Sequence, residues 1–325
     1  MDCKVTGAFL CLLGFGFNLS AEPFITRDQN PLAMIQGLPL PASARLPESG
    51  NLNWSGTYNI TNTLNIANTA TESILLDYES HEFISSLSYG LTSDWAVRLD
   101  VPVIYYGAGF LDSRIDHWHK TLGLPQGYRP TFPDNQFQLN YRYKGTTIVS
   151  IDQASSSLGD IQLGIGKQFV SSAEHAFSLW ITADLPTGDQ QNLTGSKKTD
   201  WIIQAAGEHL LNPNWQIDAN LAFILPGDSS LNGAPVASHI WSAQTGIEWR
   251  AFHPVSLRVQ LNGHSAVYPD SGLELLGSNY QLVFGGRAHL SQCSSFDVSA
   301  SEDVKVGASP DVSFGFSYRH LTACH

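Results

Sequence analysis

The chain has 325 residues, with 17 basic and 29 acidic side chains and a formal net charge of −12. This acidic balance argues against a nucleic-acid partner, because binding to phosphates requires a basic surface. Charged residues make up only 14% of the sequence, compared with about 25% in a typical water-soluble chain. The mean hydropathy is nevertheless only −0.09. This combination is typical of membrane strands with one apolar face and one uncharged polar face.

The first 21 residues have the form of a secretory signal peptide. Lys4 precedes an apolar stretch at residues 5–19, and the small residues Ser20 and Ala21 precede the expected cleavage point after Ala21. The apolar stretch is shorter than the roughly 20 residues of a membrane-spanning helix. We therefore expect residues 1–21 to be removed during export of the protein to the bacterial outer membrane.

The next segment, residues 22–50, is rich in proline. Its prolines are Pro23, Pro31, Pro39, Pro41 and Pro47. Because proline disrupts both helix interiors and central strands, we expect a segment with little regular structure. It either stays in the periplasm or enters the lumen of a barrel as a partial plug.

Residues 52–64 show the clearest strand pattern of the chain. Large apolar side chains such as Trp54, Tyr58 and Leu64 alternate with polar ones, which indicates a strand with one apolar and one polar face. A soluble sandwich strand averages about 5–6 residues, whereas a tilted barrel strand needs about 9–11 to cross a membrane, so the length favours a barrel. The pattern recurs at residues 95–101, 137–143, 161–166, 215–223, 255–262, 296–301 and 312–319.

Short and long connections alternate along the same region. Residues 92–94, 212–214 and 291–294 are short turns, whereas residues 187–199 and 227–237 are long loops. In outer-membrane barrels the short turns are periplasmic and the long loops extracellular. The sequence therefore predicts an all-β, antiparallel, closed transmembrane β-barrel over residues 51–320, followed by a tail at 321–325. We expect about 14 strands, with 12 or 16 as alternatives because residues 142–153 are hard to divide.

The longest connection, residues 106–134, is expected to contain one short helix. Leu111, Ile115 and Leu122 recur at helical spacing, and another face carries Asp112, Asp116 and His119. These three side chains could bind a divalent cation, either free or held by lipopolysaccharide. In the simpler interpretation they form a solvated face of a helix that packs inside the barrel mouth. The sequence predicts no other metal site and no cofactor.

Two pairs of charged residues are candidates for lining the lumen. Asp77 and Glu79 alternate with apolar residues, and the next strand places Arg98 and Asp100 on its polar face. They could line a solute pathway, or they could brace the barrel through inward ion pairs. Two cysteines remain after the signal peptide, Cys293 in a short turn and Cys324 beyond the last strand, and we hypothesise a disulfide between them.

Several motifs resemble a proteobacterial outer-membrane protein family known only as a domain of unknown function. They are Thr26 to Leu32 with Gly37-Leu38-Pro39, Gly109 to Ser113 with Ile115, His117, His119 and Gly123-Leu124-Pro125, and Leu158 to Ile161. The resemblance would cover nearly the whole mature chain. It implies a barrel without an established activity, so it assigns no catalytic residue.

We expect a narrow diffusion channel for small solutes, embedded in outer-membrane lipid and lipopolysaccharide and inserted by the barrel-assembly machinery. Two alternatives remain, a barrel hydrolase acting on lipid and a structural or adhesion barrel. The sequence contains neither Gly-x-Ser-x-Gly nor His-Glu-x-x-His, so a non-enzymatic role is favoured.

Overall fold

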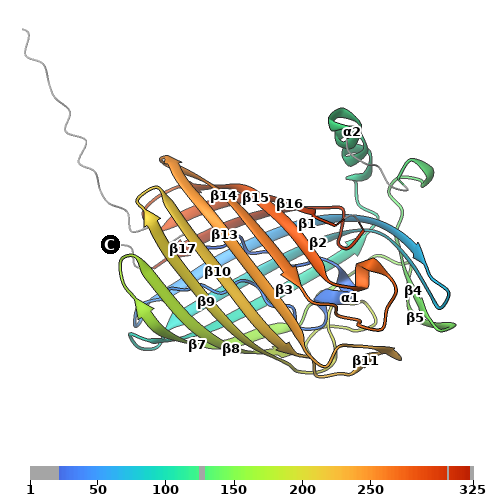
Figure 1. Cartoon of the computed structure of the whole chain (residues 1–325), viewed down its shortest axis with the longest axis horizontal. Coiled ribbons are helices and arrows are strands. Elements are labelled where there is room, and N and C mark those ends of the chain that lie inside the picture. Colours follow the sequence, from blue (N-terminus) through green and yellow to red (C-terminus); the bar gives the residue numbers. More distant parts are fainter. Residues whose placement is uncertain (1–21, 124–128, 306, 323–325) are drawn as a thin grey trace, which may run out of the picture.

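The computed structural model describes residues 22–123, 129–305 and 307–322. The predicted signal peptide therefore lies outside the described residues. The main element is a closed antiparallel barrel in which the last strand pairs with the first (Figure 1). Its strands are β1 (Leu52–Asn68), β2 (Glu72–Gly90), β3 (Trp95–Gly107), β7 (Ile161–Ser171), β8 (His175–Leu185), β9 (Asp200–Asn212), β10 (Trp215–Leu225), β13 (Ile240–Phe252), β14 (Val255–His264), β15 (Asn279–His289), β16 (Ser294–Asp303) and β17 (Val312–Leu321).

The barrel therefore has 12 strands, so the expected count of about 14 was wrong and the lower alternative is correct. The additional strands in the expected count correspond to β4 (Gln138–Tyr143) and β5 (Thr146–Ile151), which have six residues each. A strand that crosses a membrane needs about 9–11 residues. Instead, β4 pairs with β2 at residues 72–77, beyond the residues of β2 that pair with β3, and β6 (Ser155–Leu158) likewise pairs with β3 beyond β7. These three short strands extend the wall at one end of the barrel.

The two ends of the barrel differ as the sequence predicted. Short turns join the strands at one end, which we call the turn end, and residues 186–199, 226–239 and 265–278 form long connections at the other, the loop end. The predicted helix is present as α2 (Asp112–Leu122), which stands at the loop end in Figure 1. The remaining short elements are α1 (Pro31–Met34), η1 (Arg129–Thr131), η2 (Glu274–Leu276) and the small pair β11 (Ser230–Leu231) and β12 (Ala234–Pro235). No helix among the described residues is long and apolar enough to cross a membrane.

The strands turn their apolar side chains outward and their polar side chains inward. In β14, Leu257 and Val259 are 43% and 48% exposed, whereas Arg258 and Gln260 between them are 3% and 1% exposed. This arrangement is the reverse of a water-soluble barrel and matches a barrel with a lipid-facing exterior. Exposed Trp54 and Trp95 lie at the turn end and exposed Trp201 and Trp241 at the loop end, as in the aromatic belts of such barrels.

Candidate functional site

Residues 22–50 run through the inside of the barrel, and we call this segment the plug. It starts at the turn end, where Glu22 pairs with Arg319 of β17. It reaches the loop end at α1, where the Asn30 side chain donates to the Leu275 carbonyl at 2.9 Å. It then returns to the turn end, where Ser49 forms a bridge to Gly90 at the end of β2. The plug is therefore an elongated hairpin that runs inside the barrel (Figure 1).

The plug reverses direction because of local sequence features near its tip. Asn30 caps α1 by accepting the backbone N–H of Leu32 at 3.1 Å, and Pro31 occupies the first helical position. Gly37 then has φ of +73°, a conformation that favours glycine. A Cβ at this position would lie 2.8 Å from Cβ of Asp200, so glycine also allows the turn to approach β9.

Amide side chains of the barrel wall accept hydrogen bonds from the backbone of the plug. Because the plug pairs with no strand along most of its length, its N–H groups need other partners. The N–H groups of Phe24, Ala42 and Leu46 donate to the side chains of Gln260, Asn220 and Gln168 at 3.0, 2.9 and 2.8 Å. The polar inner face of the barrel thus replaces a neighbouring strand.

Two buried charged contacts hold the plug to the wall. Arg27 donates from Nη2 to Oε1 of Glu82 in β2 at 2.8 Å, and the two side chains are 8% and 1% exposed. Asp28 lies 2.9 Å from Nε2 of His264 in β14, again with both side chains buried. Since β2 and β14 lie in different parts of the wall, consecutive plug residues hold the plug to two places in the barrel.

At the turn end, a group of charged residues holds the beginning of the plug. Asp297 in β16 accepts from Arg287 at 2.7 Å and from Arg319 at 3.1 Å. The same two arginines contact Glu22, Arg287 through the backbone carbonyl at 2.8 Å and Arg319 through the carboxylate. The start of the plug is therefore bound to β15 and β17, and Asp297 of β16 between them holds the two arginines.

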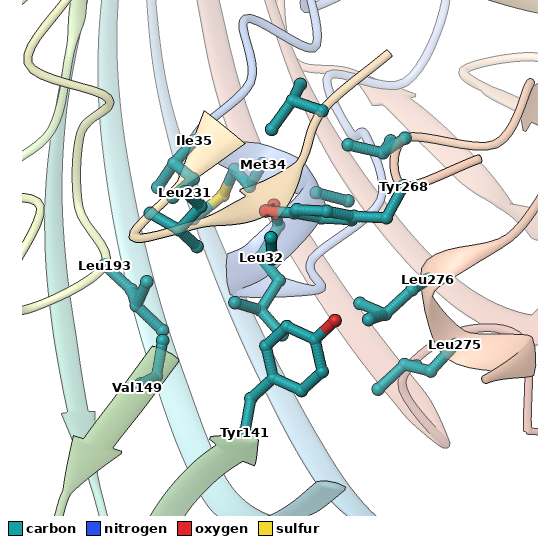
Figure 2. Packing of buried hydrophobic residues seen from close by; sticks show 14 of the residues in the cluster. Leu32, Met34, Ile35, Tyr141, Val149, Leu193, Leu231, Tyr268, Leu275 and Leu276 are labelled. Atoms are coloured by element: carbon teal, nitrogen blue, oxygen red, sulfur yellow. Dashed lines mark hydrogen bonds between the residues drawn. The ribbon is translucent and has the colours of Figure 1, made fainter. Parts of the chain in front are cut away.

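At the loop end, apolar side chains close the interior around α1 (Figure 2). Leu32 is fully buried, and its carbonyl accepts from the Tyr268 hydroxyl at 2.9 Å. Tyr141 of β4, Leu193 and Leu276 pack in the same cluster. Two cavities of about 30 and 80 Å³ lie between the plug and the wall, which is room for a few water molecules. The plug and the apolar cluster together occlude the interior.

The four predicted lumen-lining residues divide into two groups. Arg98 and Asp100 of β3 pair at 2.8 Å, and Arg98 also donates to the Pro41 carbonyl of the plug at 2.7 Å. Glu79 instead accepts the backbone N–H groups of Phe110 and Leu111, both at 3.0 Å. Asp77 lies on the part of β2 that pairs with β4. Arg98 therefore contacts the plug. Asp77 and Glu79 lie on the face of β2 opposite to Tyr78 and Glu82, which contact the plug, so their expected place in the lumen was wrong, and Glu79 instead holds the loop after β3.

The predicted cation-binding face of α2 is used in another way. The Asp112 carboxylate accepts from Arg129 at 3.0 Å, from Asn62 at 2.9 Å and from the backbone N–H of Asn135 at 2.6 Å. Within the described ranges, no group of three metal-ligating side chains could hold a metal ion, and this includes Asp116 and His119. Asp112 thus stabilises the fold of its own loop.

The α2 loop is attached to the rim of the barrel. Arg129 also pairs with Asp311, at 2.6 Å, in the connection before β17. Burial alone would lower the pKa of Arg129, but the carboxylates of Asp311 and Asp112 hold this pKa above its usual value, so the guanidinium stays charged. Leu111 and Ile115 pack against Val312 with Ile60 and Phe314 alongside. The helix therefore packs on β1 and β17, and not inside the mouth as the simpler interpretation proposed.

Cys293 is disulfide-bonded in the structure. It lies in the short turn between β15 and β16, and its carbonyl accepts the N–H of Leu321 at 2.9 Å, which brings the chain end to this turn. Cys324 lies outside the described residues. The pairing of these two cysteines stays a prediction.

The sequence did not single out Glu82, His264 and Arg287 as contacts of the plug. His264 continues the inward alternation of residues 255–262, but Glu82 lies on the face of β2 opposite to the predicted Glu79, so the pattern read at residues 74–79 pointed away from it. Their partners are as far away as Asp28, 236 residues before His264. No spacing in the sequence could reveal contacts over such a separation.

Comparisons with known proteins agree with this architecture. Residues 9–321 match a family described as "Protein of unknown function (DUF3187)", which confirms the resemblance noted in the sequence. The comparison with curated proteins found no match.

The fold is also similar to solved structures of very different sequence. An outer membrane channel from Pseudomonas putida F1 is 12% identical, with 86% of this chain and 98% of that chain covered and a TM-score of 0.56. The NanC porin is 7% identical, with 82% and 97% covered and a TM-score of 0.46. The toluene transporter TodX from Pseudomonas putida is 11% identical, with 85% and 91% covered and a TM-score of 0.42. At 12% identity, the likeness to the Pseudomonas putida F1 channel is one of fold alone.

Proposed function

The chain belongs to this family of unknown function, and we propose that it is an outer-membrane channel for small solutes that the plug opens and closes. One observation carries the proposal. A closed barrel with an apolar exterior encloses a polar interior, and a single segment of the same chain fills that interior. A barrel that served only as a membrane anchor would have no need of a polar interior wide enough to hold two lengths of chain.

The contacts of the plug support a segment that can move. Its polar contacts are hydrogen bonds and ion pairs with wall side chains, such as Arg27 to Glu82 and Ala42 to Asn220, and no strand ladder fixes the plug to the wall. Water can replace such polar contacts when the plug leaves, at a much lower free-energy cost than exposing an apolar core. The apolar cluster around Leu32 has to separate as well, which favours the closed state at rest.

Locking the plug covalently tests the proposal. The Ser178 hydroxyl of β8 donates to the Ser43 carbonyl of the plug at 3.0 Å, so these positions are in contact. The full-length Ser43→Cys/Ser178→Cys variant, reconstituted in planar bilayers, should show no openings when oxidised and should regain wild-type openings after reduction. The two single variants and the wild type, treated with the same reductant, control for the disulfide of Cys293.

Two results would contradict the proposal. One is equal conductance of the oxidised and reduced double variant, with the cross-link verified by mass spectrometry, because the plug would then not control the pathway. The other is the absence of openings in the wild type, in the single variants and in the reduced double variant, which would argue against a channel.

A further inference from the structure

One part of the inner wall carries a row of amide side chains. Asn220 of β10 is directly opposite Gln244 of β13, Gln244 is opposite Asn262 of β14, and Asn262 is opposite Gln281 of β15. All four side chains face the interior, and none is more than 9% exposed. Four amides in register across four neighbouring strands form one continuous uncharged polar surface, which we call the amide row.

The amide row and its neighbour Asn279 retain hydrogen-bonding groups without partners. Among the described residues, Oε1 of Gln244, Nδ2 of Asn262 and both side-chain polar atoms of Asn279 are buried without a hydrogen bond. Asn279 lies opposite His264, one step along the strand from the row. Buried polar groups are nearly always paired in proteins, so a set of unpaired ones indicates a place where a solute or water completes the bonding.

These groups surround the cavity of about 30 Å³ between the wall and the plug. On the plug side the cavity is lined by Thr26, Arg27 and Asp28, among others. Arg27 pairs there with Glu82 and Asp28 with His264, and both plug residues leave the cavity when the plug moves. On the wall side, the side chains that line the cavity are uncharged apart from His264, so this surface offers mainly amide donors and acceptors.

The chemistry of this surface selects a class of solute. An amide offers an acceptor oxygen and a donor N–H₂, and a hydroxyl group can satisfy both. An ion that left water for this surface would lose hydration without gaining an opposite charge, which is unfavourable. A small molecule with several hydroxyl groups can instead exchange its hydrogen bonds to water for bonds to successive amides.

We propose that the amide row is the selective surface of the open channel and that it favours small uncharged polyhydroxylated solutes of the sugar class. This proposal rests on the proposed function, because the row becomes accessible to solutes only when the plug moves. The plug occupies the row in the closed state, where the Ala42 N–H donates to Asn220. The solute would therefore replace contacts that the plug makes.

Uptake of labelled solutes into proteoliposomes tests the proposal with the full-length protein. Arabinose and glucose are compared with gluconate and glucosamine, which are similar in size but carry a charge. We expect arabinose uptake in the wild type to exceed uptake of both charged solutes. In the Asn262→Leu/Asn279→Leu variant, arabinose uptake should fall by about tenfold, as expected for the loss of two hydrogen bonds, with little change for gluconate.

Two further variants separate the role of the amides from damage to the fold. Asn279→Leu alone removes no hydrogen bond of the folded protein, so it should fold normally and still lower arabinose uptake. Gln191→Leu, in an exposed position of the loop after β8, is the matched control and should behave as the wild type.

The outcomes distinguish this proposal from the proposed function. Equal uptake of neutral and charged sugars, or an unchanged ratio between them in both Asn279 variants, would overturn the role of the amide row while leaving a channel. The absence of uptake of every solute, in the wild type and in all variants, would instead overturn the proposed function and this inference with it.

Discussion

The guanidinium of Arg27 lies 2.8 Å from the carboxylate of Glu82 in the interior of the barrel. The same carboxylate accepts from Gln29 at 3.1 Å and from Asn59 at 3.2 Å. One buried side chain of β2 thus binds two residues of the plug and one of β1. Its charge therefore contributes directly to the seating of the plug.

Replacing this carboxylate should release the plug. Glu82→Gln keeps the size of the side chain but leaves the Arg27 guanidinium buried without an opposite charge. Breaking one side of a buried ion pair costs about 3–5 kcal/mol, so the closed state should lose stability and the open probability in planar bilayers should rise. Glu174→Gln, in an exposed turn between β7 and β8, is the control. An open probability equal to that of the wild type would show that the ion pair does not hold the plug.

The ionic contacts of Arg129 should control the order of the α2 loop. In Asp112→Asn, Arg129 keeps Asp311 but loses one charged partner, and the amide cannot accept the same three bonds. We expect a cost of about 1–3 kcal/mol to the folded loop, measured as faster cleavage of residues 108–137 by added protease. Ser113→Ala, which alters an exposed neighbour, should be cleaved at the wild-type rate. If Asp112→Asn were equally resistant, the network would not be what orders the loop.

Peptide mapping without reduction should find Cys293 joined to Cys324. The structure shows the disulfide at Cys293 and brings Leu321 to its turn, which leaves Cys324 three residues away along the chain. A link that closes a loop of this size contributes about 3–4 kcal/mol, so Cys324→Ser should lower the unfolding midpoint in denaturant. A Cys293 peptide linked to a second copy of the protein would contradict the pairing.

The stability cost of a charged residue on the outer face should depend on its depth in the membrane. Leu221 of β10 and Leu211 near the turn end of β9 are 51% and 50% exposed. Leu221→Arg should cost about 2–4 kcal/mol if it lies near the middle of a bilayer, whereas Leu211→Arg at the interface should cost about 0–1 kcal/mol. The free energy of unfolding of each variant, measured in lipid vesicles, gives both costs. Equal costs would place the membrane elsewhere on the barrel.

The alternation of single strands was readable in the sequence because each barrel strand repeats an apolar and a polar residue with period two. Residues 52–64 and 255–262 predicted β1 and β14, and the spacing of Leu111 and Ile115 predicted α2. The strand count failed at residues 142–153, because a strand that only extends the wall alternates like one that crosses it. Length was the distinguishing signal, since β4 and β5 have only six residues each.

By itself, then, the sequence determined the local pattern of each strand, the barrel class and the family resemblance, all of which depend on neighbouring residues. Only the tertiary structure decided where residues 22–50 lie. Their five prolines exclude a helix interior and a central strand, but they do not specify a location. It also decided that Asp112 pairs with Arg129 within its own loop. The amide row is another feature that only the tertiary structure could show. Asn220, Gln244, Asn262 and Gln281 come from four strands, and only the register of those strands places the four amides side by side.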